Sequence, residues 1–151
     1  MKSLMKNTGL QSLFIFLSIF FTAYANSYAA DNTSIIGFWR TYDLQGNARS
    51  IVQFYQSNDQ FYAVVVKDLM PSPRKTPCVD PQFPGKMVVR NLKLKDINKW
   101  TDGLVLDPDA CKVYPLNVSL INHGATMAFH PYVGTPILGT TVNWQRVNNP
   151  Q

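Results

Sequence analysis

The histidines and aspartates are the side chains that could give this chain a metal-binding site. His123 and His130 are the only histidines and lie seven residues apart, on an expected hairpin and its strand, whereas a zinc site needs three or four ligands. Asp107-Pro108-Asp109 could contact a cation, but calcium loops recruit six or more oxygens. We interpret this segment as a proline-fixed turn that follows a strand. The sequence therefore predicts no metal and no cofactor.

The acidic residues also give no indication of catalysis. Each of the nine acids is Asp, so Glu, the most adaptable general acid or base, is absent. The chain has no Ser in a nucleophile elbow and no Gly-rich phosphate loop after a strand. Catalysis would require an Asp whose pKa is raised inside the fold, and the sequence marks none. We expect a protein that is not an enzyme.

The N-terminal segment is typical of a secretory signal peptide, which we assign to residues 1–29. Lys2 and Lys6 precede an apolar run over residues 10–24, and small residues allow cleavage after Ala25 or after Ala29. The alternative is an uncleaved anchor, but the run is short for a membrane span of about 20 residues. No Cys follows for lipid attachment. We expect a periplasmic or secreted protein with no stable membrane anchor after cleavage.

The charge balance argues against nucleic acid as a partner. The whole chain has fourteen Lys and Arg against nine Asp; removing Lys2 and Lys6 with the leader leaves twelve against nine, or +3. The basic residues are scattered and form no stripe with interleaved aromatic residues, which a nucleic-acid groove would need.

Cys78 and Cys111 are the only cysteines, and in an exported chain they favour one disulfide. The chain-entropy model gives such a crosslink roughly 3–4 kcal/mol of stability. Buried free thiols or a cysteine-pair metal site are the alternatives. The crosslink would pin the stretch over residues 70–86, which contains five prolines and cannot pair as a strand or form a helix.

The rest of the chain predicts an all-β domain over residues 35–147, because short apolar or alternating segments are separated by turn residues. The expected strands are 35–43, 51–55, 61–67, 87–95, 103–106, 113–121, 125–132 and 137–147. Residues 96–102 are expected to be a turn or helical turn around Trp100, and residues 131–136 a loop. Eight antiparallel strands in succession close into an up-and-down barrel, with a two-sheet sandwich as the alternative.

Alternation along the strands predicts the side chains that face the barrel interior, which are Val52, Phe54, Tyr114, Leu116, Val118, Leu120, Met127 and Phe129. In the strand over residues 61–67 both faces are apolar, so alternation gives no answer there. The interior is either filled by side chains or holds one small apolar or amphipathic ligand, because small barrels do both. The candidate ligand-binding residues are Phe54, Tyr114, Leu116, Val118, Met127 and Phe129.

The two ends of this domain resemble the lipocalin signature. Gly37-Phe38-Trp39 lies on the first expected strand, and Trp144-Gln145-Arg146 lies on the last. The resemblance implies that Arg146 covers the Trp39 indole and that Gly37, Trp39, Trp144 and Arg146 close one end of the barrel. A guanidinium over an indole contributes roughly 0.5–2 kcal/mol.

A closer resemblance covers residues 36–147 and is to a bacterial family of small exported lipocalin-like proteins, catalogued as a domain of unknown function. Its pattern is carried by Gly37-Phe38-Trp39, residues 100–108, Lys112-Val113-Tyr114, Tyr132-Val133-Gly134, Leu138-Gly139 and residues 144–147. The chain departs from that family at Cys111, where a Gly is usual, and at His130-Pro131, where Arg-Gly is usual. A clear C-terminal helix is also missing from the pattern.

This resemblance implies a lipocalin-like fold and an exported location, but no activity. Two functions follow as hypotheses. The first is binding of a small apolar or amphipathic ligand inside the barrel. The second is a protein-interaction or inhibitor module of the cell envelope that acts through the Pro-rich loop over residues 70–86. The sequence does not determine the oligomeric state.

Overall fold

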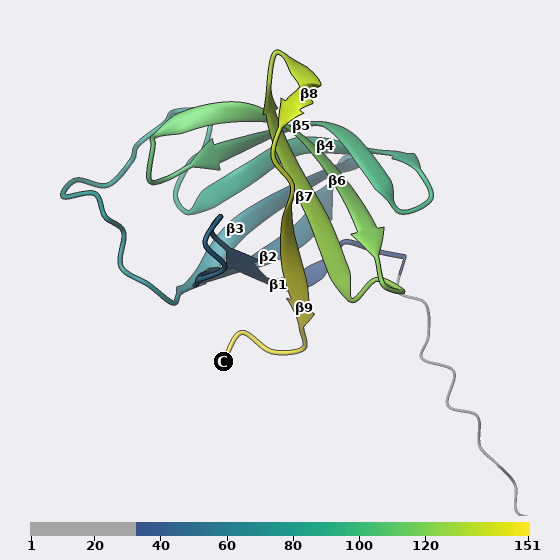
Figure 1. Ribbon diagram of the computed structural model, residues 1–151, viewed down its shortest axis with the longest axis horizontal. Helices are drawn as coiled ribbons and strands as arrows, with labels where there is room; N and C mark the ends of the chain where they lie inside the picture. Colours follow the sequence, from purple (N-terminus) through teal and green to yellow (C-terminus); the bar gives the residue numbers. More distant parts are fainter. Residues whose placement is uncertain (1–32) are drawn as a thin grey trace, which may run out of the picture.

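The computed structural model describes residues 33–151, so the predicted signal peptide at residues 1–29 lies outside the described part. Residues 33–151 form nine β-strands, which Figure 1 labels in chain order. They are β1 (Gly37–Tyr42), β2 (Ala48–Ser57), β3 (Gln60–Asp68), β4 (Met87–Asp96), β5 (Lys99–Asp107), β6 (Lys112–Ile121), β7 (Thr126–Val133), β8 (Thr135–Gly139) and β9 (Val142–Val147).

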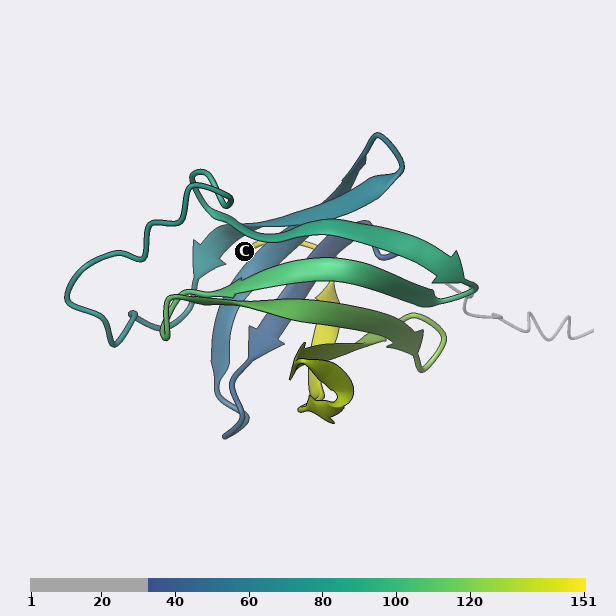
Figure 2. The ribbon, with the colours of Figure 1, turned by 90° about the horizontal axis from the view of Figure 1, so that it is seen from above.

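Eight of the nine strands in residues 33–151 close into an antiparallel barrel. Their hydrogen-bonded order is β6-β5-β4-β3-β2-β1-β9-β7, and a further pairing of β6 with β7 completes the ring. Strand β8 pairs only with β7 and lies outside the ring (Figures 1 and 2). The predicted all-β, lipocalin-like, eight-stranded barrel is therefore confirmed.

The antiparallel order gives the barrel two different ends. The chain segments before β1 and after β9 lie at one end, together with the β2–β3, β4–β5 and β6–β7 turns; we call it the closed end. The loops over residues 43–47, 69–86 and 108–111 lie at the other, together with the β7–β8 hairpin; we call it the loop end. In both views the loop over residues 69–86 projects well beyond the strands.

The turn predicted for residues 96–102 is wrong, because β5 already begins at Lys99. Trp100 pairs with Leu94 and with Val118 and is only 2% exposed. Its ring meets the Phe61 ring edge-on at 6.1 Å. Burial of the large indole extends the strand, and the positive φ of Asn98 (58°) lets a short turn reverse the chain.

The loop predicted for residues 131–136 and the single last strand over 137–147 are also wrong. Strand β7 continues through Pro131 to Val133, and Gly134, with φ of 69°, reverses the chain into β8. Residues 140–141 belong to no strand, and β9 starts at Val142. Thr140, Thr141 and Val142 are all β-branched and no Gly or Pro lies between Gly139 and Val147, so the pattern resembled one continuous strand.

The barrel interior is a packed apolar core. Alternation correctly predicted its inward residues on β2, β6 and β7, which are Val52, Phe54, Leu116, Val118, Leu120, Met127 and Phe129. On β3, where both faces are apolar, Phe61 and Ala63 are the buried ones. Irregular register between β3 and β4 shifts which residues face inward, as β-bulges do.

Candidate ligand site at the loop end of the barrel

Trp39 fills the closed end of the barrel. Its side chain is fully buried, and its indole Nε1 donates a hydrogen bond of 2.8 Å to the carbonyl oxygen of Ile35. The guanidinium carbon of Arg146 lies 4.2 Å from the centroid of the indole. Gly37 has φ of 124°, and a Cβ there would lie 3.4 Å from Arg146 Nη1. The positive φ is therefore what favours glycine at this position, since a Cβ would make only ordinary contact with the guanidinium.

Arg146 also joins three chain segments at this end. Its Nε donates to the carbonyl of Gly124 at 2.8 Å, Nη1 to that of Ile36 at 3.1 Å, and Nη2 to that of Ser34 at 2.5 Å. Partial burial lowers the pKa of the Arg146 guanidinium from its ordinary value of 12.5. The side chain remains charged at neutral pH, and it ties the segment before β1 to the β6–β7 turn.

The candidate ligand-binding residues named from the sequence lie mostly in the packed core. Phe54, Leu116 and Met127 are fully buried, Val118 is 2% exposed and Phe129 is 4% exposed. Trp144 stacks on Phe129 with ring centroids 3.8 Å apart. The centroids of the Trp144 and Phe54 rings are 6.5 Å apart. Side chains thus occupy the centre of the barrel, and these residues form a floor beneath the loop end.

Tyr114, the remaining candidate, lies at the edge of this core. It is partly buried and packs against the core together with Val65, Val88 and Val142. These side chains come from β3, β4, β6 and β9, and each lies in the half of its strand nearest the loop end. They form an apolar rim above the aromatic floor.

Strands β1 and β9 separate near the loop end and leave a pocket in the barrel wall. Their pairing covers only Phe38 with Val147, Trp39 with Arg146 and Arg40 with Gln145. Beyond these pairs lies a pocket of about 300 Å³. Its lining residues are Tyr42, Asp43, Leu44, Gly46, Thr141, Val142, Asn143 and Gln145. We call it the β1–β9 pocket.

The β1–β9 pocket combines an apolar base with polar walls, and Asp43 is the charged residue among the lining side chains. Val142 belongs both to the pocket and to the rim that packs on the core. The Tyr42 hydroxyl donates to Gln145 Oε1 at 3.0 Å and holds the two separated strands in place. Asn143 and Thr141 are exposed on the β9 side. This set of groups can accept and donate hydrogen bonds around a molecule that also has an apolar part.

Asp43, the acid that lines the pocket, is already committed to the β1–β2 turn. Its Oδ1 accepts hydrogen bonds from the backbone N–H groups of Gln45, at 3.0 Å, and Asn47, at 2.8 Å. The side-chain amide of Asn47 donates to Oδ2 at 3.1 Å. The hydrogen bonds from Asn47 are the main cause that lowers the pKa of Asp43 from its ordinary value of 3.8. Asp43 therefore shapes the pocket as a turn residue.

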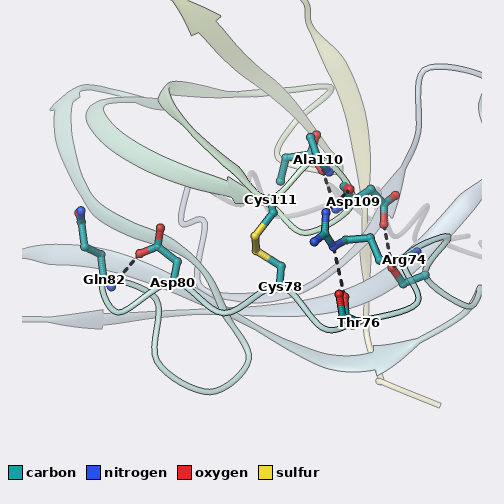
Figure 3. The surroundings of a disulfide bond; sticks show 10 residues. Arg74, Thr76, Cys78, Asp80, Gln82, Asp109, Ala110 and Cys111 are labelled. Carbon is teal, nitrogen blue, oxygen red and sulfur yellow. Dashed lines mark hydrogen bonds between the residues drawn. A yellow bond between two sulfur atoms is a disulfide. The ribbon is translucent and has the colours of Figure 1, made fainter.

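The Pro-rich loop is crosslinked to the β5–β6 turn. Cys78 and Cys111 form a disulfide, so the predicted pairing is confirmed (Figure 3). Asp109 in the same turn accepts a 2.6 Å bond from Arg49 Nη2, which is also an ion pair. Ser72 Oγ donates to the other carboxylate oxygen at 3.3 Å, and Arg74 Nη1 donates to the Asp109 carbonyl at 3.4 Å. Asp109 thus joins β2, the loop and the turn.

The second half of this loop is held by an aromatic anchor. Phe83 is only 3% exposed, and the Arg90 guanidinium lies 5.9 Å from its ring centroid. Arg90 also donates to the Gln82 carbonyl at 2.6 Å. Val79, next to the disulfide, is by contrast 84% exposed. The loop is therefore anchored at several points along its length, and Val79 is exposed between Cys78 and Phe83.

The sequence pointed to the core and missed the pocket. A hydrophobic pattern identifies inward positions, but it carries no signal for the point at which β1 and β9 part. Asp109 was interpreted as part of a turn, which it is, but its contacts with Arg49 and Ser72 depend on the tertiary fold. Within residues 33–151 no group of three or more His, Cys, Asp and Glu side chains could hold a metal ion. No helix of the same residues is long and apolar enough to cross a membrane.

A closed eight-stranded antiparallel barrel, plugged at one end by Trp39 beneath Arg146, defines the class of lipocalin-like proteins. Within this class the chain belongs to the family described as "Uncharacterized protein conserved in bacteria (DUF2147)", which matches residues 37–146.

A solved structure described as "Protein HP1028 from the human pathogen Helicobacter pylori belongs to the lipocalin family" is similar in fold. The TM-score is 0.64 at 18% sequence identity, over 78% of this chain and 86% of that one. At this identity the similarity concerns the fold alone. No curated protein matches the chain.

Proposed function

We propose that the protein is exported and binds a small amphipathic molecule in the β1–β9 pocket, without catalysing a reaction on it. The observation that carries the proposal is the position of Val142, which forms the apolar base of a 300 Å³ pocket and also packs on the core. Ligand pockets of proteins typically have about 300–1,000 Å³. A molecule at the lower end of that range fits this pocket.

The pocket side chains suggest how such a molecule would be oriented. Its apolar part would lie against Val142 and the exposed side chain of Leu44. Its polar part would reach Asn143, Thr141 and the Tyr42–Gln145 pair, which offer both donors and acceptors. Asp43 is held by its own turn, so the proposal favours an uncharged polar group over a cation.

Native mass spectrometry of the purified protein, with displacement of an environment-sensitive dye, tests this proposal. Val142→Trp should fill the base of the pocket and weaken dye binding at least about tenfold, which corresponds to 1.4 kcal/mol. Val133→Trp is the matched control, because Val133 is 60% exposed and does not line the pocket. If Val142→Trp binds as the wild type does, the pocket is not the site; if nothing binds the wild type, the binding function is refuted.

The Pro-rich loop supports a second candidate function, that of a module that binds another envelope protein. The observation that favours it is that the disulfide, Asp109 and Phe83 anchor the loop while Val79 is 84% exposed. A loop held in one conformation loses less entropy on binding. Reduction of Cys78–Cys111 should abolish a loop-borne interaction and leave binding in the β1–β9 pocket within about twofold of the unreduced protein, a change below 1.4 kcal/mol.

Export is the part of this proposal that depends on residues 1–29. A disulfide in the barrel is consistent with a periplasmic or extracellular protein, since such compartments are oxidising. Cell fractionation followed by intact-mass measurement tests it. A cytoplasmic, full-length chain would refute export. An intact mass equal to that of a chain starting at Asn26 or at Ala30 would identify the cleavage site.

A further inference from the structure

We propose that the tip of the β7–β8 hairpin inserts into the interface of a lipid bilayer and docks the protein there reversibly. The tip exposes large aliphatic side chains: Ile137 is 91% exposed, Leu138 is 67% exposed and Val133 is 60% exposed. Figure 1 shows this hairpin projecting beyond the barrel at β8. Exposed apolar groups gathered on a protrusion mark a contact site for an apolar partner. This inference does not depend on the ligand proposed above.

The sequence around the tip is free of charged residues. From Val113 to Gln145 the sequence has no Lys, Arg, Asp or Glu, although average composition would place about eight charged residues in a stretch of that length. This stretch forms nearly all of β6 and all of β7 and β8, together with most of β9. Charged side chains are costly inside a bilayer, so a charge-free hairpin can enter the interface at low cost.

The hairpin is also held in a fixed position. The His130 ring on β7 contacts the Pro136 carbonyl through Nε2 at 2.7 Å and the Thr141 hydroxyl through Nδ1 at 2.9 Å. Because a carbonyl only accepts hydrogen bonds, Nε2 carries a hydrogen. Gly139 lies so close to this ring that a Cβ there would be 2.6 Å from Nε2. The tip is therefore presented by a braced hairpin, and its exposure is a feature of the folded state.

The closed end also has an apolar protrusion, but charged residues surround that protrusion in the sequence. Ile97 in the β4–β5 turn is 78% exposed, and Leu94 nearby is 59% exposed. Lys95 and Asp96 directly precede Ile97 in the sequence, and Lys99 follows it two residues later. Insertion of this turn would carry charges into the apolar layer, which disfavours it. The charge pattern therefore selects the β7–β8 hairpin and makes Ile97 a matched control.

The size of the tip favours a lipid bilayer, and not a second copy of the chain, as its partner. A stable protein dimer buries about 800 Å² of each partner. The β7–β8 hairpin presents three large apolar side chains, Val133 from β7 and Ile137 and Leu138 from β8, on a convex tip that is too small for such an interface. A bilayer accepts a convex tip of this size, and the resulting attachment is weak and reversible, as for a single short anchor.

Vesicle co-sedimentation of the chain without residues 1–29 tests the proposal, with phosphatidylcholine vesicles and with phosphatidylethanolamine–phosphatidylglycerol vesicles. We expect partition into both at about 0.1 M and about 0.5 M salt, because apolar insertion is not screened. Ile137→Ser combined with Leu138→Ser should lower the partition constant about tenfold, equivalent to 1.4 kcal/mol. Ile97→Ser should leave it within twofold. Binding by the double variant equal to that of the wild type would overturn the proposal.

A second variant keeps the test independent of folding defects in the first. Ile137→Trp should gain a blue-shifted emission component with vesicles, quenched by brominated lipid and absent from the wild type. Three other outcomes would overturn the proposal: an unshifted emission, binding that disappears at about 0.5 M salt, or a dimer in analytical ultracentrifugation that the double serine variant abolishes. The last result would identify a second copy of the chain as the partner.

Discussion

Replacing Arg146 by Met tests how the barrel is closed. The substitution keeps an apolar stem over the Trp39 indole but removes the charge and the three hydrogen bonds to Gly124, Ile36 and Ser34. The carbonyls of Ser34 and Ile36 lie in an exposed segment and can bind water instead, so they contribute little to the loss. The bond to Gly124 and the contact with the indole are the parts that water cannot replace.

The magnitude follows from these two parts. A hydrogen bond from a charged donor contributes about 1.5–3 kcal/mol, and a guanidinium–indole contact adds about 0.5–2 kcal/mol. Because Arg146 is only partly buried, we take about 3 kcal/mol for their sum. The described domain spans residues 33–151, which gives an unfolding entropy of about 250 cal/mol/K. The expected fall in Tm is then about 12 °C.

Thermal unfolding by circular dichroism measures this change. Arg146→Lys keeps the positive charge and one donor and should lose about half as much as Arg146→Met. Arg40→Met is the control, because Arg40 follows Trp39 on β1 and faces away from the core; it should change Tm by no more than about 2 °C. A Tm of Arg146→Met within about 2 °C of the wild type would refute this account of the closed end.

Three further predictions concern the loop end. Cys78→Ser with Cys111→Ser should lower stability by about 3–4 kcal/mol, since the disulfide closes a 33-residue separation; unfolding in urea measures it, and an unchanged midpoint would refute it. Hydrogen bonds to the Asp43 carboxylate lower its pKa in the folded state below 3.8. The stability that the ionised carboxylate adds is therefore present above pH 3.8 and is lost as pH falls through the lower folded-state pKa. The Tm difference between wild type and Asp43→Asn should therefore shrink between about pH 5 and about pH 2, and a difference that grows would contradict the assignment. Gly139→Ala would place a Cβ 2.6 Å from the Pro131 carbonyl, so amide exchange across residues 134–141 should accelerate as about 1–3 kcal/mol of local stability is lost; unchanged exchange would contradict this contact.

The sequence predicted the barrel because its signals are local. Alternation along β6 identified the inward side chains from Leu116 to Leu120, since side chains of a strand point alternately to its two faces. The resemblance at the two chain ends placed Trp39 and Arg146 together, although they are far apart in the sequence and adjacent in the register of β1 and β9. Two cysteines downstream of a predicted signal peptide were enough to predict the disulfide.

The features that the sequence did not predict depend on the tertiary fold. Trp100 appeared to lie in a turn because polar residues surround it, but burial against Phe61 extends β5 through it. The segment around Gly134 was predicted to be a loop over residues 131–136, but pairing extends β7 through Pro131 to Val133 and Gly134 turns the chain into β8. The β1–β9 pocket exists because two strands stop pairing after Arg40 and Gln145, and no residue type marks that point.

The position of the pocket follows from how the chain uses its large aromatic residues. Trp39, Trp100 and Trp144 all lie in the barrel core, with Phe54 and Phe129 between them, so the interior stabilises the fold and has little room for anything else. The proposed ligand would then bind where the wall is incomplete, which is where β9 leaves β1. The β7–β8 hairpin lies at this same end, so a protein docked on a bilayer through its tip would hold the pocket close to the lipid surface. Ligands that partition into membranes are therefore the first whose binding to the wild type and to Val142→Trp should be measured.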